Sequence, residues 1–264
     1  MNDEEIRLPI PRPGTIRNLV GGERRAIAGL RALLAEWRGL VVLPEDADDL
    51  ERGKRGNGWA SVATPEAWRA EPELVWRFYQ ERRAQLHQVE PSAAHRALHG
   101  LGEALRAAGQ VFTLISQNVD DLHQRCGGEV LDMHGQLRRL ACERCGRRVR
   151  DEDSVDPSCF VPCSGCGFER LRPDVVWFGE VPHHLDEIAE AVEDATHFLA
   201  CGTSGAVYPA AGLLAAARAR GVETFVNSLE EPDNLAAGED TFWPGRAVEV
   251  LPQRIAAWRV AWGV

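Results

Sequence analysis

Four cysteines of this chain are spaced as metal ligands. They form two C-x-x-C pairs, Cys142 with Cys145 and Cys163 with Cys166, separated by a spacer of a length common in zinc ribbons. In a zinc ribbon each pair lies on a tight turn, and the two turns supply four thiolates at the corners of a tetrahedron. Because four protein ligands leave no open coordination position, the spacing predicts a structural zinc. The alternatives are free or buried thiols, or a register in which Cys159 replaces one ligand.

A second group of candidate residues follows the apolar stretch HFLA. Cys201, Gly202, Thr203 and Ser204 stand between this expected strand and a helix that Pro209 opens. Backbone N–H groups at such a strand-to-helix turn can bind a phosphate or a ribose. A tight turn whose hydroxyls cap the helix would have the same sequence, so the motif alone supports both interpretations.

A third group surrounds a histidine. His134 occurs in DMHGQL, just before the cysteine-rich segment, and the polar loop QNVDDLH follows the apolar stretch VFTLIS. Imidazole titrates near neutral pH, which suits a general base. A lone histidine is nevertheless more often a structural residue.

The helices and strands that position these groups can be predicted from apolar spacing and capping residues. The stretch GERRAIAGLRALLAEWRG has helical spacing and leads into the short apolar strand LVVL. Thr64 and Pro65 are a typical N-cap and first-turn proline for TPEAW, and ELVWRFYQERRAQL and SAAHRALHGLGEALRAAG are two further expected helices. The strands VFTLIS, HFLACG and ETFVNS, with the helix YPAAGLLAAARARG between the last two, indicate a parallel sheet.

The whole chain is acidic and contains no membrane-spanning pattern. Its 264 residues carry a formal net charge of −10, so no basic surface is expected for nucleic acid. No run reaches the roughly 18 apolar residues of a membrane span, and the first residues lack the pattern of a secretory signal. Paired cysteines at metal spacing fit a reducing compartment. We therefore expect a cytoplasmic protein without nucleic-acid or membrane partners.

Six motifs resemble, in the same order, those of the sirtuin family of NAD-dependent lysine deacylases: QNVDDLH, DMHG, CERC, CSGC, RPDVVWFGE and GTSGAVYPA. The resemblance covers about residues 63–252. It implies an α/β fold with a Rossmann-like parallel-sheet domain, residues 1–136 and 173–264, and an inserted zinc-ribbon domain, residues 137–172. It also implies acyl-lysine proteins or peptides as substrates and NAD as co-substrate, with release of nicotinamide and O-acyl-ADP-ribose.

The resemblance assigns roles to residues that match the family's motifs. His134 would be the general base, Asn118 would also lie at the reacting centre, and His123 is interpreted as structural. Three residues are predicted to face the nicotinamide ribose: Gln117, Asn118 and Asp120. Four are predicted to hold the adenosine side: Gly202, Thr203, Ser204 and Asn227. Four more are predicted to form a strand along which a substrate peptide pairs: Val176, Phe178, Gly179 and Glu180.

The segment ATPEAW followed by VWRFYQERR resembles the branch of bacterial and mitochondrial sirtuins that prefers acidic acyl groups. Tyr79 and Arg82 form the Y-x-x-R pair of that branch, and residues three apart share a helix face. Because a guanidinium can bind a carboxylate through two hydrogen bonds, the pair predicts a preference for succinyl-, malonyl- or glutaryl-lysine over acetyl-lysine. A core tyrosine beside a solvated arginine is the alternative interpretation.

One segment departs from the family's pattern. After the strand that LVVL predicts, sirtuins have a G-A-G-x-S-A loop and a Phe-Arg pair that hold the pyrophosphate, whereas this chain continues with PEDADDLE. Carboxylates near the pyrophosphate would weaken NAD binding. Three basic residues in ERGKRGNG, Arg52, Lys54 and Arg55, form either a substitute phosphate clamp or part of a charged surface loop.

The altered loop leaves two functions open. The chain is predicted to be a sirtuin-like deacylase, and the alternative is a catalytically impaired relative that binds peptides or nucleotides. An NAD-linked dehydrogenase is disfavoured because no G-x-G-x-x-G follows an expected strand.

The two interpretations of the loop predict opposite effects on NAD binding. If the carboxylates face the pyrophosphate, replacing Asp46 and Asp48 by Asn should tighten NAD binding by about 1 kcal/mol, because partly screened like charges are removed. If Lys54 and Arg55 form a clamp, replacing both by Met should weaken binding and flatten its salt dependence. Calorimetric titration with NAD at two ionic strengths distinguishes them, and unchanged affinity in both double variants would place the loop away from NAD.

Overall fold

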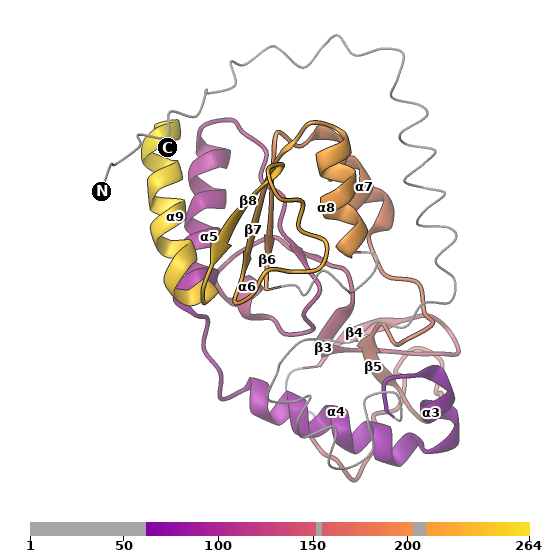
Figure 1. Ribbon diagram of the computed structural model, residues 1–264. Coiled ribbons are helices and arrows are strands. Elements are labelled where there is room, and N and C mark those ends of the chain that lie inside the picture. The colour runs from indigo at the N-terminus through magenta and orange to yellow at the C-terminus, as the bar shows by residue number, and fades with distance from the viewer. Residues whose placement is uncertain (1–61, 152–154, 203–209) are drawn as a thin grey trace.

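The computed structural model describes residues 62–151, 155–202 and 210–264. Several expectations lie outside these ranges: the N-terminal helix and strand, the segment 44–58, and the predicted cofactor-binding residues Thr203 and Ser204. The described chain has a larger region around a parallel sheet and a smaller region around an antiparallel one (Figure 1). None of the helices in the described ranges is long and apolar enough to cross a bilayer.

A parallel sheet forms the centre of the larger region. Its three strands, in their order across the sheet, are β6 (His197–Cys201), β7 (Glu223–Ser228) and β8 (Asp240–Pro244). The strands expected from HFLACG and ETFVNS are thereby confirmed. A second parallel pair, β1 (Ile115–Ser116) with β2 (Leu131–Asp132), is much shorter than the strand expected from VFTLIS.

Four helices cover the two faces of this sheet (Figure 1). On one face lie α5 (Ala93–Ala107) and α9 (Ala247–Trp262), and on the other lie α7 (Leu185–Asp194) and α8 (Ala210–Ala219). Parallel neighbours need a crossover connection, which α8 supplies between β6 and β7. The helices on both faces make this region Rossmann-like, as expected.

Apolar side chains fill both interfaces between the sheet and its helices. Because side chains alternate along a strand, Leu199 of β6 packs with the α5 and α9 cluster while Phe198 packs with the α7 and α8 cluster. The first cluster is mainly aromatic, and Phe225, Trp243 and Trp258 are among its buried members. The parallel sheet therefore has a complete apolar layer on each side.

The smaller region combines three antiparallel strands with two helices from earlier in the chain. Strand β3 (Gly135–Ala141) lies between β4 (Arg148–Arg150) and β5 (Arg172–Val175). Helices α3 (Pro65–Ala70) and α4 (Pro72–Leu86) pack beside these strands (Figure 1). Capping determines where α3 begins, since the Thr64 hydroxyl accepts the Ala67 N–H at 3.0 Å, as predicted.

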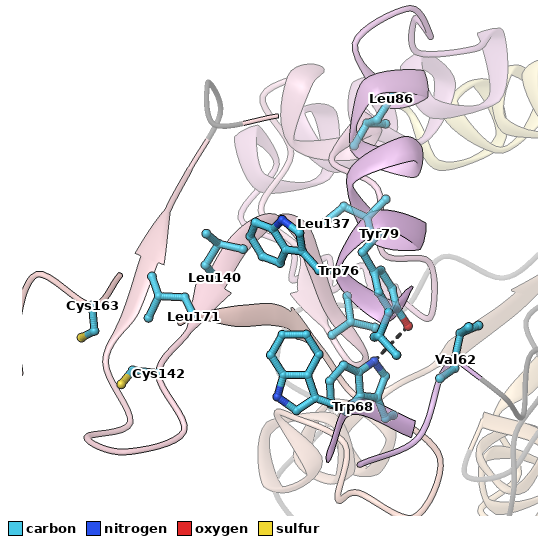
Figure 2. Close-up of a cluster of buried hydrophobic side chains, with 14 of the residues drawn as sticks. Val62, Trp68, Trp76, Tyr79, Leu86, Leu137, Leu140, Cys142, Cys163 and Leu171 are labelled. Atoms are coloured by element: carbon cyan, nitrogen blue, oxygen red, sulfur yellow. Dashed lines mark hydrogen bonds between the residues drawn. The ribbon is translucent and has the colours of Figure 1, made fainter. Parts of the chain in front are cut away.

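One buried core joins the two helices to the cysteine-rich segment. Figure 2 shows Trp68, Trp76 and Tyr79 of the helices facing Leu140 and Leu171 of the strand region. The boundaries of the zinc-ribbon domain at residues 137 and 172 remain a prediction. Its apolar side chains, however, are buried against residues 62–86.

A buried arginine connects α4 to the residue that follows β4. Arg83 is 1% exposed, and its guanidinium lies 3.1 Å from the Asp151 carboxylate. It also donates to the Asp151 carbonyl oxygen and, at 3.3 Å, to the Gln80 side chain. Burying a guanidinium is costly unless its donors are satisfied, so these partners account for its burial.

Replacing Arg83 by Met should therefore destabilise the protein by about 3 kcal/mol or more, because it removes the buried partner of the Asp151 carboxylate. Urea unfolding followed by tryptophan fluorescence measures the change. Arg77 is exposed on the same helix, and its replacement by Met is the matched control, with an expected change within about 0.5 kcal/mol. Equal losses in the two variants would contradict a structural role for Arg83.

Candidate functional site

His134 lies between β2 and β3, where the two regions meet. Its Nδ1 is 2.8 Å from the Gln117 carbonyl oxygen, and its own carbonyl accepts the Val176 N–H at 2.8 Å. The next residue, Gly135, has a φ of 80°, and a Cβ there would lie 2.0 Å from the Asp174 carbonyl oxygen. Only glycine allows β3 and β5 to approach so closely, so this glycine determines the backbone position of His134.

The hydrogen bond to Gln117 decides which ring nitrogen of His134 carries the proton. A carbonyl oxygen only accepts, so Nδ1 is the donor and Nε2 keeps its lone pair. Burial lowers the pKa of His134; the bond to Gln117 opposes this shift and the charge of His183 reinforces it. The ring is therefore neutral at physiological pH, with Nε2 able to accept a proton.

The loop after β1 carries the residues predicted to face the nicotinamide ribose. Asn118 is exposed, and its backbone N–H is bound by the Ser116 hydroxyl at 3.1 Å. The Asp120 carboxylate accepts the N–H of Leu122 at 2.9 Å, where α6 (Leu122–Arg125) begins. The loop therefore holds Gln117 against His134, presents the Asn118 carboxamide to solvent, and uses Asp120 partly to start a helix.

His123 belongs to the same motif but is positioned differently. Its ring packs against that of His95, with 4.5 Å between the ring centroids. Burial lowers the pKa of His123 to about 4, so the ring is neutral at physiological pH. This packing agrees with a structural role.

Gly202 and Asn227 lie together at the carboxyl ends of β6 and β7. Gly202 has a φ of 61°, and its N–H donates to the Asn227 carbonyl oxygen at 2.9 Å. The Asn227 side chain is buried, and its amide group donates to the carbonyl oxygens of Trp243 at 2.8 Å and Gly245 at 3.0 Å. Nucleotides bind at this edge of Rossmann-like sheets. The Asn227 side chain holds β8 in register, and its contact with NAD remains a prediction.

The segment predicted to pair with substrate as a strand has another conformation. Strand β5 ends at Val175, and the chain turns over residues 176–180. The Glu180 N–H donates to the Trp177 carbonyl oxygen at 2.9 Å, and Gly179 adopts a φ of 86°, which closes the turn. The expectation of a strand through residues 176–180 is thus wrong. The segment still lies beside His134, through Val176.

The two residues of the Y-x-x-R pair differ in burial: Tyr79 belongs to the core of the smaller region, whereas Arg82 is partly exposed. Tyr79 is 3% exposed, and its hydroxyl oxygen accepts the Trp177 indole N–H at 2.9 Å, drawn as a dashed line in Figure 2. The Arg82 guanidinium lies 3.6 Å from the centre of the Phe78 ring, and its charge acts on Tyr79. Burial raises the pKa of Tyr79 to about 12, so its hydroxyl remains protonated. Tyr79 is thus buried, as the core-tyrosine alternative expects, with Arg82 beside it.

Sequence reasoning omitted Arg172, the first residue of the RPDVVWFGE motif. Arg172 donates to both carboxylate oxygens of Glu180, at 2.6 and 2.8 Å, and stacks 3.5 Å from the centre of the Trp177 ring. The motif begins with an arginine and ends with a glutamate, and this opposite charge was the available signal. Both side chains shape the turn that follows β5.

The four paired cysteines converge on one point. Their Sγ atoms all lie within 4.8 Å of one another, with 3.6 Å between Cys142 and Cys166 and 3.7 Å between Cys145 and Cys163. A tetrahedron with metal–sulfur bonds of about 2.3 Å has edges of about 3.8 Å, so the four donors fit zinc. Cys159 is exposed and does not belong to this group.

Backbone geometry favours a thiolate at Cys163. Hydrogen bonds from the backbone N–H groups of Gly165 and Cys166 lower the pKa of the Cys163 thiol. Each C-x-x-C pair is followed by a glycine at positive φ, Gly146 at 71° and Gly167 at 69°, which completes a tight turn. The two turns therefore present the four sulfur atoms in the arrangement that the spacing predicted.

Comparison with known proteins identifies the family. The Sir2 family model matches residues 56–209. The NAD-dependent protein deacylase of Yersinia pseudotuberculosis is 43% identical over 198 residues, which cover 74% of this chain and 69% of the relative. That of Bdellovibrio bacteriovorus is 45% identical over 199 residues, which cover 74% of this chain and 81% of the relative. The chain therefore belongs to the Sir2 family, the sirtuins.

Solved structures agree with this assignment. A Sir2 homologue in complex with NAD matches with a TM-score of 0.69 at 32% identity, over 76% of this chain and 78% of that chain. A Sir2 homologue in complex with ADP-ribose matches with a TM-score of 0.74 at 31% identity, over 87% and 89% of the two chains. The fold expected from the resemblance, a Rossmann-like sheet with a zinc ribbon, is confirmed.

Zinc removal should destabilise the protein. We expect about one zinc per chain, loss of that zinc in Cys145→Ser, and a lower melting temperature in that variant, because a structural site contributes its binding energy to folding. Cys159→Ser is the matched control and should retain both zinc and melting temperature. Elemental analysis and thermal unfolding measure these quantities; fewer than about 0.5 equivalents in the unaltered protein would argue against the site.

Proposed function

We propose that this chain is an NAD-dependent protein-lysine deacylase that uses His134 as its general base. The observation that carries the proposal is the neutral imidazole of His134, held through Nδ1 by the Gln117 carbonyl oxygen where the parallel sheet meets the zinc ribbon. Several curated relatives at 42–45% identity are named NAD-dependent protein deacylases, which supports the same activity.

The site residues divide the chemistry between them. NAD would supply the ribose that receives the acyl group and the nicotinamide that leaves; with one water consumed, the products are nicotinamide, the deacylated lysine and O-acyl-ADP-ribose. His134 Nε2 takes the proton of a ribose hydroxyl while Gln117 holds the ring in the required tautomer. The exposed Asn118 carboxamide orients the ribose, with Asp120 beside it.

The remaining assignments place the rest of NAD and the substrate. We assign the adenosine side to Gly202, Thr203, Ser204 and Asn227, at the carboxyl edge of the parallel sheet. The substrate is an acyl-lysine protein or peptide lying along Val176, Phe178, Gly179 and Glu180. Solved Sir2 proteins bound to an acetylated peptide and to a myristoylated histone peptide support this class of substrate. Bacterial relatives and the reduced cysteine cluster support a cytoplasmic location.

The preferred acyl group is acidic. Arg82 lies one turn from Tyr79 on α4 and its charge acts on the protonated hydroxyl of Tyr79, and a guanidinium with a neutral donor is suited to a carboxylate. We therefore assign succinyl-, malonyl- or glutaryl-lysine as the preferred substrate over acetyl-lysine. The second candidate, an impaired relative that binds peptides or nucleotides without turnover, is favoured only by the acidic segment 44–58.

Activity should depend on neutral His134. With NAD and a succinylated peptide, nicotinamide release measured by chromatography should fall about 10²- to 10⁴-fold in His134→Ala. The neutral ring is the active form and burial lowers its pKa, so kcat/KM should hold down to the ordinary value of 6.5 and fall only at lower pH. Binding of NAD without turnover in the unaltered protein would favour the impaired relative.

Replacing Arg82 by Met should remove most of the preference for acidic acyl groups. Loss of a guanidinium partner from a buried carboxylate costs about 2–5 kcal/mol, so kcat/KM for succinyl-lysine should fall at least tenfold while that for acetyl-lysine changes little. Arg77→Met, exposed on the same helix, is the control. An unaltered protein that prefers acetyl-lysine would contradict the assignment.

A further inference from the structure

Trp177 is held in place from three directions. Its backbone N–H donates to the Glu180 carboxylate at 2.8 Å, and the Arg172 guanidinium that binds the same carboxylate stacks over the indole ring. The ring also packs against Trp68, with 5.8 Å between the ring centroids, and the residue is 2% exposed. A side chain so enclosed has one accessible rotamer, so the direction of its indole N–H is determined.

The indole N–H determines the role of the Tyr79 hydroxyl. Indole only donates, so at 2.9 Å the Tyr79 oxygen must be the acceptor. A hydroxyl carries one proton of its own, and accepting from Trp177 leaves that proton for an acceptor in another direction. The Tyr79 hydroxyl is thus set as a donor, and its raised pKa keeps the proton in place.

The surroundings of Tyr79 favour an anionic acceptor. Arg82 lies one turn along α4 and its charge acts on Tyr79, as does that of Arg172; the charge of Glu180, which pairs with Arg172, acts in the opposite sense, so Arg82 is the cation that favours an anion here. The turn after β5 carries Trp177 and begins at Val176, which is bonded to the His134 carbonyl. A carboxylate at the end of an acyl chain whose lysine lies along this turn would meet a neutral donor and a guanidinium together.

We propose that Trp177 is a positioning residue for acyl selectivity: its indole N–H turns the Tyr79 hydroxyl into a donor for the carboxylate of an acidic acyl group. This inference rests on the proposed function, in which Tyr79 and Arg82 recognise that carboxylate. Trp177 itself does not touch the substrate. It acts through the hydroxyl of Tyr79, 98 positions earlier in the chain.

Trp177→Phe tests the proposal because it keeps a ring for packing and removes the N–H. KM for a succinyl-lysine peptide should rise about three- to tenfold, the effect of one hydrogen bond, while kcat and both constants for the acetyl-lysine peptide stay within about twofold. Tyr79→Phe should have a similar effect. The double variant should be no worse than Tyr79→Phe alone, because both substitutions disable one hydroxyl.

Trp68→Phe is the matched control. Trp68 is fully buried in the same core, but its indole N–H donates to Glu143 at 2.7 Å. The Trp68→Phe variant should lower the melting temperature as Trp177→Phe does. It should leave unchanged the ratio of kcat/KM for the succinyl-lysine peptide to kcat/KM for the acetyl-lysine peptide.

Four outcomes would overturn the proposal. If Trp177→Phe raises KM equally for both peptides, or if Trp68→Phe shifts selectivity to the same extent, the role of Trp177 is structural only. If the unaltered protein prefers succinyl-lysine through Arg82 and Trp177→Phe preserves that preference, the inference alone fails. If the unaltered protein has no such preference, the proposed acyl assignment fails and the inference fails with it.

Discussion

The close approach of β3 to β5 at Gly135 is the constraint on which the site depends. A Cβ at this position would lie 2.0 Å from the Asp174 carbonyl oxygen, so any other residue would push the strands apart. The approach brings the His134 carbonyl to the Val176 N–H and leaves its ring against Gln117. One backbone contact therefore positions His134, the proposed base, and anchors the start of the turn expected to meet the substrate.

Paired charges and shared apolar surface keep this junction rigid. Arg139 of β3 reaches both Asp132, in the larger region, at 3.3 Å and Asp174 of β5 at 3.0 Å. Both carboxylates are buried, and a buried carboxylate is tolerated only with such partners, so these pairs constrain the strands' relative positions. The cysteine-rich segment has little apolar surface of its own. The cysteine cluster, and the apolar core that the segment shares with α3 and α4, stabilise it instead.

The sequence by itself determined the features that depend on neighbours close along the chain. Cysteine spacing predicted the cysteine cluster, and Thr64 and Pro65 predicted the start of α3. Two apolar stretches on either side of an expected helix predicted β6 and β7. These signals are local, since a cap, a tight turn or a strand is specified within a few residues. The order of short motifs also identified the family. The proposed role of His134 as general base came from that resemblance, whereas its tautomer required the contact with Gln117.

Only the tertiary structure decided how distant segments meet. It placed α3 and α4 on the zinc-ribbon strands, buried Arg83 against Asp151, and joined Trp177 to Tyr79. It also ended β5 at Val175 although the apolar residues continue, because the Arg172–Glu180 ion pair and a glycine at positive φ fold the chain back. Apart from the Arg172–Glu180 pair, these contacts join residues tens of positions apart, for which spacing along the chain carries no signal.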